Sequence, residues 1–412
     1  MVMPMLTFKT QGKLNEFALS DVGEFYGGLS GKTKENFGVG DSKFITYMNV
    51  FSNVIAKPEM CDSVDVGPNE RQNLVANGDI LFTQSSETPE EVGMASVWLG
   101  DFNAYLNSFS FGFRLKDKRR IDSVYLAYLL RSPVYRKKIS VQAQGISRYN
   151  LSSSRLSLLK IRIHDVEEQR KIAAFLSMVD EKIKCVYEIA NKKRELFDNI
   201  ANKIFAREIC FLNCSDKSIE EWKLLSLGDC CSFYAGQTPK STSLNFYGGN
   251  IQWIASGDLN RGVVVKSEKT LTESGLKSAN LRILSKGTLV VALFGLEAET
   301  VCGNCGLLGV DSAINQACMS ITPNDDSLMS EYLFYYYKAT GRKYCKRYAQ
   351  GTKQQNLNVE ILSRFEILVP SIDVQKRVCD LLRTFERDIQ ILVNKASYWR
   401  KIRKAFMQQI FV

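Results

Sequence analysis

The chain has 412 residues, of which 45% are hydrophobic and 24% are charged, and its formal net charge is +10. These proportions are ordinary for a globular protein and exclude a disordered chain or a collagen-like fibre. The length predicts two or three domains. The single histidine, His164, argues against histidine-based catalysis, a Ser-His-Asp triad and a histidine-rich metal site.

Segments for export or membrane insertion are not expected. No apolar run approaches the length of a transmembrane helix, and the first residues lack the pattern of a signal peptide. The 11 cysteines are irregularly spaced, which is typical of reduced thiols in the cytoplasm. Cys302 and Cys305 have CxxC spacing, but the second pair that zinc requires is missing. We therefore expect a cytoplasmic protein with no metal site.

The basic net charge permits a polyanionic partner without establishing one. The most basic long segment is 372–412, with nine Lys and Arg residues against four Asp and Glu residues. The other long segments are closer to neutral. If DNA is the ligand, local patches of charge must bind it.

Elements follow the same order twice along the chain, with an offset of 206 residues. Short β-rich runs come first, for example 79–83 and 287–292, followed by a short helix at 124–130 and 331–338. A polar loop follows at 144–150 and 350–356, then a strand at 159–163 and 365–369, and each copy ends in a long helix. A period of about half the chain indicates domain duplication and not a solenoid. We expect an α+β protein with a first domain at 1–165, a first long helix at 166–208, a second domain at 209–371 and a second long helix at 372–412.

Both long helices carry apolar residues at alternating steps of four and three, which is a heptad seam. The seam residues are Ile172, Leu176, Val179, Ile183, Val186 and Phe197 in the first helix and Val378, Leu382, Phe385, Ile389, Leu392 and Trp399 in the second. At 1.5 Å per residue, each helix would be about 55–60 Å long. We expect two antiparallel coiled-coil helices that separate the domains with pseudo-two-fold symmetry. The alternative is that each amphipathic helix lies on its own domain.

Two similar readers at a fixed separation suit a bipartite DNA target, because the geometry of the reader is matched to the half-sites. The chain resembles the specificity subunit of type I restriction-modification enzymes over essentially its full length. The stretches that carry the resemblance are 28–33, 44–51, 144–151, 160–163, 168–176 and 180–183 in the first half and 236–240, 247–254, 350–357, 367–370 and 374–378 in the second.

The resemblance implies that each half contains a target recognition domain that reads one half of an interrupted double-stranded DNA sequence. It also implies that the helices set the gap and dock two modification subunits, which bind S-adenosylmethionine and methylate adenine N6. Motor-nuclease restriction subunits would join optionally. The chain itself would be non-catalytic and would hold no cofactor. A coiled-coil scaffold without a nucleic-acid role remains the alternative, and a stand-alone methyltransferase or nuclease is disfavoured because its motifs are absent.

Candidate DNA contacts are residues that offer hydrogen bonds to base edges or positive charge to phosphates. In the first domain they are Lys32, Thr33, Lys34, Arg136, Lys137, Gln144, Gly145, Ser147, Arg148, Tyr149 and Asn150. In the second they are Gln237, Thr238, Lys240, Arg342, Lys343, Gln350, Gly351, Lys353, Gln354, Gln355 and Asn356. The alternatives are a solvated connector for the loops and a solvated face for the charge runs. Residues 31–33 do not form a nucleotide-binding P-loop because its first glycine is absent, and the tyrosines at 332 and 335–337 are expected to pack within a helix.

Overall fold

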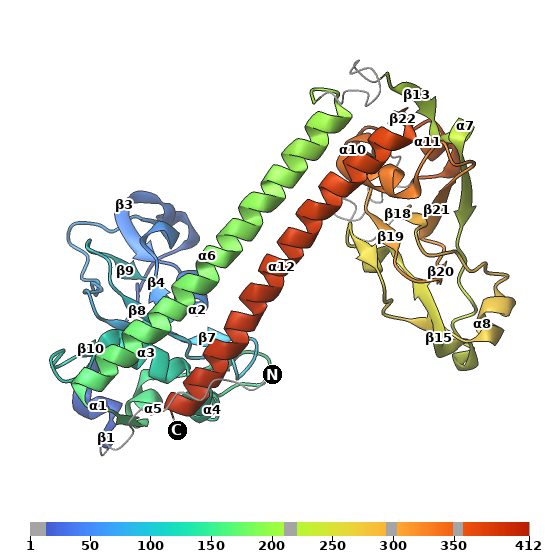
Figure 1. Cartoon of the computed structure of the whole chain (residues 1–412). Helices are drawn as coiled ribbons and strands as arrows, with labels where there is room; N and C mark the ends of the chain where they lie inside the picture. The colour runs from blue at the N-terminus through green and yellow to red at the C-terminus, as the bar shows by residue number, and fades with distance from the viewer. Residues whose placement is uncertain (1–13, 210–220, 294–302, 349–356, 412) are drawn as a thin grey trace. The chain divides into compact units, whose positions relative to one another are not determined.

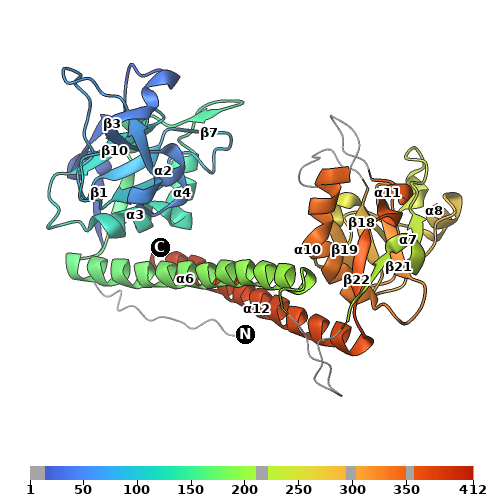
Figure 2. The same cartoon turned by 90° about the horizontal axis from the view of Figure 1, so that it is seen from above.

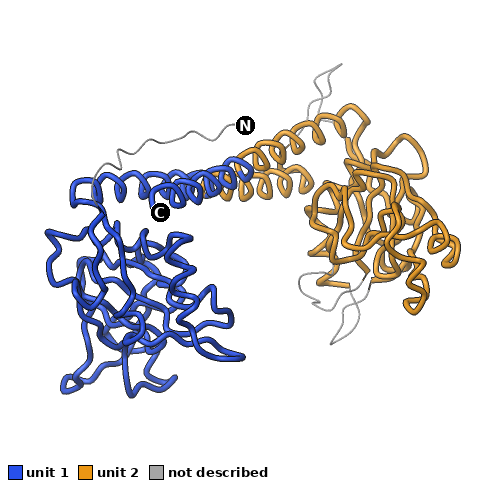
Figure 3. Tube along the Cα trace, turned by 90° about the horizontal axis from the view of Figure 1, so that it is seen from below, with its two compact units in different colours: residues 1–187, 393–412 blue, residues 188–392 orange. Residues whose placement is uncertain are grey.

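The computed structural model describes residues 14–209, 221–293, 303–348 and 357–411 (Figure 1). The chain divides into two compact units (Figure 3). Unit 1 comprises residues 1–187 and 393–412, and unit 2 comprises residues 188–392. Two long helices, α6 (Val166–Phe205) and α12 (Ile372–Ile410), each contribute one part to both units.

Unit 1 is built on a five-stranded sheet. Its strands lie in the order β2 (Gly23–Gly27), β10 (Ser110–Leu115), β6 (Ile80–Thr83), β8 (Ala95–Trp98) and β4 (Ile55–Ala56). A three-stranded sheet has the order β5 (Cys61–Val64), β3 (Phe37–Ile45) and β9 (Tyr105–Leu106), and two-stranded sheets pair β1 (Asn15–Ala18) with β12 (Lys160–Ile163) and β7 (Ser85–Ser86) with β11 (Tyr149–Asn150). The shorter helices are α1 (Leu19–Val22), η1 (Lys34–Asn36), α2 (Tyr47–Ser52), η2 (Pro58–Met60), α3 (Ser123–Arg131), α4 (Pro133–Ser140) and α5 (Ser153–Ser157).

Unit 2 has a five-stranded sheet with the corresponding order. Its strands are β14 (Cys231–Ala235), β21 (Cys318–Pro323), β18 (Leu289–Ala292), β19 (Cys305–Leu308) and β16 (Val263–Val264). A three-stranded sheet has the order β17 (Thr270–Leu271), β15 (Tyr247–Ile254) and β20 (Ser312–Ile314), and β13 (Lys223–Ser226) pairs with β22 (Glu366–Val369). The shorter helices are α7 (Leu227–Cys230), η3 (Leu244–Phe246), η4 (Ser256–Asp258), α8 (Glu273–Ser278), α10 (Ser330–Tyr348) and α11 (Val359–Ser363).

The two units repeat one topology down to the strand directions. In each five-stranded sheet the edge pair, β4–β8 or β16–β19, is parallel and the other pairs are antiparallel. In each three-stranded sheet the central strand has one antiparallel and one parallel neighbour. The predicted α+β class and the domain duplication are therefore confirmed.

The core of unit 1 lies on the face of the five-stranded sheet that α3 covers (Figure 2). Phe82 from β6 and Phe113 from β10 are fully buried there, and residues 125–130 of α3 are all buried against them. Ile172 of α6 and Phe406 of α12 belong to the same cluster. The long helices are therefore part of the core of the unit. Burial of each such side chain stabilises the fold by about 1.5–3 kcal/mol.

Local sequence sets the bounds of α3. The Asp122 carboxylate caps its start by accepting a hydrogen bond from the Tyr125 N–H at 2.8 Å. The helix ends before Pro133, because a residue that precedes proline avoids the helical region and Ser132 then caps α4. In unit 2, Ala339 occupies the position of this proline, and α10 continues to Tyr348. The predicted helix at 331–338 was therefore too short. Its tyrosines are buried, as expected.

A buried glutamine near the start of each long helix ties that helix to its unit. In unit 1 the Gln169 Oε1 accepts a hydrogen bond from the Asp122 N–H at 2.9 Å, and its Nε2 donates to the carbonyl oxygens of Arg120 and His164. In unit 2 the partners of Gln375 are the Met329 N–H and the carbonyl oxygens of Ser327 and Pro370. Both glutamines are buried. The identical bonding explains why both copies have glutamine at this position.

The long helices contact each other in antiparallel orientation in both units. In unit 1, Phe175 and Phe406 form a ring pair with centroids 5.2 Å apart, and Asp180 is paired with Arg403. In unit 2, the Lys193 Nζ lies 2.6 Å from the Asp388 Oδ2. Of the predicted seam residues, those buried are Ile172, Leu176, Val179, Ile183, Val186, Phe197, Val378 and Leu382, and those half-buried are Phe385, Ile389, Leu392 and Trp399. Each helix also packs on the domain of its unit, so the two packing arrangements considered from the sequence coexist.

Candidate nucleic-acid interface

The loop 144–150 of unit 1 is a tight, exposed turn. Its ends are joined by two backbone hydrogen bonds between Gln144 and Asn150, at 2.9 and 2.8 Å. Gly145 has a φ of +143°, and a Cβ there would lie 1.9 Å from the Arg148 carbonyl oxygen, so the turn requires glycine. Between the ends, Ile146, Ser147 and Arg148 are exposed, with Ile146 97% exposed, whereas Tyr149 is half-buried.

The body of unit 1 holds this loop from its C-terminal side. Tyr149 and Asn150 form β11, which pairs with β7, and the next residue, Leu151, is fully buried. The loop is therefore a short projection with a fixed base. It presents the side chains of Gln144, Ser147, Arg148 and Asn150, which offer hydrogen-bond donors and acceptors of the kind that read base edges.

A hollow of about 330 Å³ lies beside the loop and includes Arg148 in its lining. Tyr47 and Phe51 of α2 stack on one side with ring centroids 5.9 Å apart, and the Tyr47 hydroxyl donates to the Ser85 carbonyl oxygen at 2.6 Å. Partial burial raises the pKa of Tyr47 above its ordinary value. The carboxylates of Glu87 and Glu91 also line the hollow, so its surface offers acceptors as well as one guanidinium.

Tyr47 and Phe51 were not among the contacts predicted from the sequence. These residues are far from the loop along the chain, and only the tertiary fold brings them together. The stretch 44–51 did contribute to the family resemblance, which is the one signal that pointed to this region.

Lys32, Thr33 and Lys34 differ in how accessible they are to a ligand. The Lys32 Nζ lies 2.6 Å from the Glu70 Oε1, and its side chain is only 4% exposed. The hydrogen bond from Lys32, followed by those from the Gly67 N–H and Gln72, lowers the pKa of Glu70 to about 2. The Thr33 N–H donates to Asn36 at the start of η1. Lys34 is exposed.

The corresponding loop of unit 2 exposes the side chains of Gln237, Thr238 and Lys240. Aromatic donors hold its backbone. The Trp253 Nε1 donates to the Gln237 carbonyl oxygen at 3.2 Å, and the Tyr247 hydroxyl donates to that of Pro239 at 2.7 Å. The three polar side chains therefore extend from a braced backbone.

The repeated Arg-Lys pairs also divide between structural and exposed positions. The Arg136 guanidinium donates to the carbonyl oxygens of Gly93 and Glu90 at 2.7 and 2.8 Å, and burial lowers its pKa to about 10. This arginine braces the 90–93 segment. Lys137, and in unit 2 Arg342 and Lys343 of α10, are exposed.

Part of the predicted site lies outside the described residues. These positions are Gln350, Gly351, Lys353, Gln354, Gln355 and Asn356, as well as Cys302 of the CxxC pair. Within the ranges that the structure describes, no three His, Cys, Asp or Glu side chains are grouped so that they could hold a metal ion. Over the same ranges, no helix has the length and apolar character needed to cross a membrane.

Comparison with known proteins identifies the duplicated unit. Residues 12–192 and 219–396 each match the type I restriction modification DNA specificity domain. The putative type I restriction enzyme MjaX specificity subunit of Methanocaldococcus jannaschii is 23% identical over 342 residues, which cover 80% of this chain and 76% of that protein. The MjaIX specificity subunit of the same organism is 26% identical over 197 residues, which cover 47% of this chain and 44% of that protein. The match therefore spans less than half of the length of the MjaIX specificity subunit.

Solved structures share the fold. A type I restriction-modification S subunit from M. genitalium has a TM-score of 0.58 at 17% identity, and the match covers 100% of this chain and 99% of that one. A chain from a structural study of complex assembly and conformational transition of the type I R-M system has a TM-score of 0.60 at 15% identity, with the same coverage. Because the specificity domain matches this chain twice and over most of its length, the chain belongs to the type I restriction-modification specificity subunit family.

Proposed function

We propose that this chain gives a type I restriction-modification complex its DNA sequence specificity by reading a bipartite target, one half-site with each unit. The observation that carries the proposal is the double match to the specificity domain, on two units with the same sheet order. Duplicated readers with different surface residues suit two different half-sites.

The chemistry of the exposed loops supports base reading. In unit 1, the fixed turn 144–150 carries an arginine, two amides and a serine within seven residues. Arginine pairs with guanine, and asparagine or glutamine with adenine, through two hydrogen bonds each. The neighbouring carboxylates of Glu87 and Glu91 can accept hydrogen bonds from the cytosine amino group. Lys34 and Lys137 are exposed cations that would contact phosphates and fix the register.

The long helices would set the gap between the half-sites and dock two modification subunits. Support comes from their continuity, since α6 and α12 each run as one helix through parts of both units. In this proposal the modification subunits bind S-adenosylmethionine and methylate adenine N6, restriction subunits join for cleavage, and this chain acts without catalysis or a cofactor in the cytoplasm.

A map of N6-methyladenine across a host genome tests the proposal. The host expresses a compatible type I modification subunit, alone or together with this chain. We expect a new methylated motif with two short half-sites and a fixed gap only when this chain is present. A stable complex that leaves the methylation pattern unchanged would contradict the reading function. Association with other proteins but not with DNA would favour a coiled-coil scaffold.

A further inference from the structure

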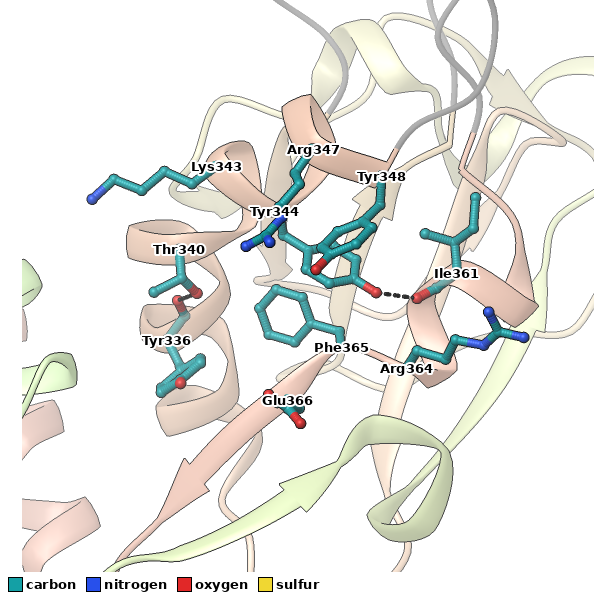
Figure 4. A pocket seen from close by; sticks show the side chains of 10 residues that line it. All are labelled: Tyr336, Thr340, Lys343, Tyr344, Arg347, Tyr348, Ile361, Arg364, Phe365 and Glu366. Carbon is teal, nitrogen blue, oxygen red and sulfur yellow. Dashed lines mark hydrogen bonds between the residues drawn. The ribbon is translucent and has the colours of Figure 1, made fainter.

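A basic and aromatic groove lies in unit 2, between the C-terminal end of α10 and α11 (Figure 4). It encloses about 620 Å³. Cationic side chains come from both helix regions, and aromatic rings form the wall between them. The residues that carry the argument are Lys343, Tyr344, Arg347, Tyr348, Arg364 and Phe365. One carboxylate, that of Glu366, also lines the groove.

Contacts within the protein hold the aromatic wall of the groove in place. The Tyr344 ring lies 4.6 Å from that of Tyr348 and 4.8 Å from that of Phe365, centroid to centroid. The Tyr344 hydroxyl donates to the Ile361 carbonyl oxygen at 2.6 Å, which ties α10 to α11 (Figure 4). Because these side chains are already ordered, binding of a ligand would cost little side-chain conformational entropy.

The two arginines in the groove keep donors available to an anion. The Arg347 guanidinium carbon lies 5.4 Å from the centroid of the Tyr348 ring, and a cation–π contact of this kind is compatible with hydrogen bonds from the N–H groups to an anion. Arg364 is paired with Glu360 one helical turn earlier, but the two side chains are 74% and 71% exposed. Such exposed pairs are weak, so a phosphate can compete for the guanidinium.

The matching surface of unit 1 has different chemistry. With the offset of 206 residues, Val141 and Leu158 occupy the positions of Arg347 and Arg364. These apolar side chains are 77% and 73% exposed. A partner that binds both units in the same way needs the same surface on both, and these two surfaces do not match. The groove therefore suits a ligand that unit 2 contacts at this place and unit 1 does not, and its cationic side chains favour a polyanion such as the DNA beside the half-site of unit 2.

We propose that this groove binds the phosphodiester backbone of DNA next to the half-site read by unit 2. Arg347 and Arg364 contact phosphate oxygens, and the exposed edge of Tyr348 packs against the sugar. These contacts position the domain without carrying sequence information themselves. The inference rests on the proposed function, and it adds a sequence-independent anchor that unit 1 lacks at the matching place.

The test uses the full chain in complex with its modification subunit and a labelled duplex that contains the methylated motif. Fluorescence anisotropy gives the affinity at several salt concentrations for the wild type and for Arg347→Val, Arg364→Leu and the double variant, which install the residues of unit 1. We expect each substitution to reduce the slope of log affinity against log salt by about one. The double variant should bind all duplexes more weakly, with the same methylated motif.

Lys346→Val is the matched control, because Lys346 is an exposed cation on the same helix that does not line the groove. Unchanged melting temperatures verify that the variants fold. A double variant whose salt slope equals that of the control refutes the anchor, while salt-dependent binding by the wild type still upholds the proposed function. If the wild type itself binds no duplex, both proposals fail. Loss of the modification subunit with DNA affinity unchanged would overturn the inference and assign the groove to an acidic protein surface.

Discussion

The two buried glutamines allow the energetics of each unit to be tested inside one molecule. We expect Gln169→Met to destabilise unit 1 and Gln375→Met to destabilise unit 2 by similar amounts. Methionine keeps the length of the side chain but removes three hydrogen bonds and leaves one N–H and two carbonyl groups without that partner. At about 1 kcal/mol for each bond, the loss is about 3 kcal/mol, or about 150-fold in the unfolding equilibrium.

Amide hydrogen exchange followed by mass spectrometry reads the two units separately, which a single melting curve of a two-unit chain does not. In Gln169→Met, the slowest amides of the β6–β10 sheet should exchange about 150 times faster, and those of β18–β21 should be unchanged. Gln375→Met should give the reverse. Gln408→Met is the control, because Gln408 is exposed on α12, and a surface change of this kind costs within about 0.5 kcal/mol. Acceleration below about fivefold, or equal acceleration in both units, would refute the reasoning.

Three further outcomes are expected. A heptad inserted in both α6 and α12 at the boundary between the units adds about 10.5 Å and should lengthen the target gap by about three base pairs; the methylation map would show an unchanged gap if the helices are not the ruler. Both helices need the insertion because they contact each other in each unit. By ¹³C NMR the Glu70 carboxyl should titrate with a pKa of about 2, and Lys32→Met should return this pKa towards the ordinary value of 4.5. Because the pKa is lower in the folded than in the unfolded state, the ionised Glu70 stabilises the fold fully above pH 4.5. This stabilisation of the fold is lost as the pH falls towards 2. Arg136→Met should accelerate amide hydrogen exchange in the β6–β10 sheet of unit 1. Lys137→Met should leave that exchange unchanged and reduce the salt dependence of DNA binding by about one ion. Equal acceleration by both substitutions would contradict the division of roles.

The repeat and the long helices were predictable because their signals are local or periodic. Matching residues in the polar loops and at the helix starts recur with an offset of 206 residues, which predicted a domain duplication. The corresponding sheet orders of the two units confirm it. The heptad spacing predicted both long helices to within a few residues of their observed ends. The end of α10 was not predicted, because the proline that ends α3 in the first copy is replaced by Ala339 in the second.

The sequence did not predict which of the candidate cationic side chains are paired within the protein and which are exposed. Arg136 and Lys137 are adjacent and both cationic, yet only the fold decides that the first braces backbone carbonyls and the second is exposed. Lys32 and Lys34 divide in the same way, because the Glu70 carboxylate that pairs with Lys32 comes from a segment 38 residues away. A charge run alone carries no information on which partners tertiary packing supplies.

By itself, the sequence determined the duplication, the α+β class and the two long helices, since each depends on spacing along the chain, and its motifs carried the resemblance to the family. The tertiary structure decided which polar side chains remain available to a ligand and which surfaces differ between the halves. The groove of unit 2 is an example, because its cations come from α10 and from the residue after α11, and aromatic contacts bring them to one wall. Burial and pairing depend on neighbours that are distant in sequence, so only the folded chain fixes them.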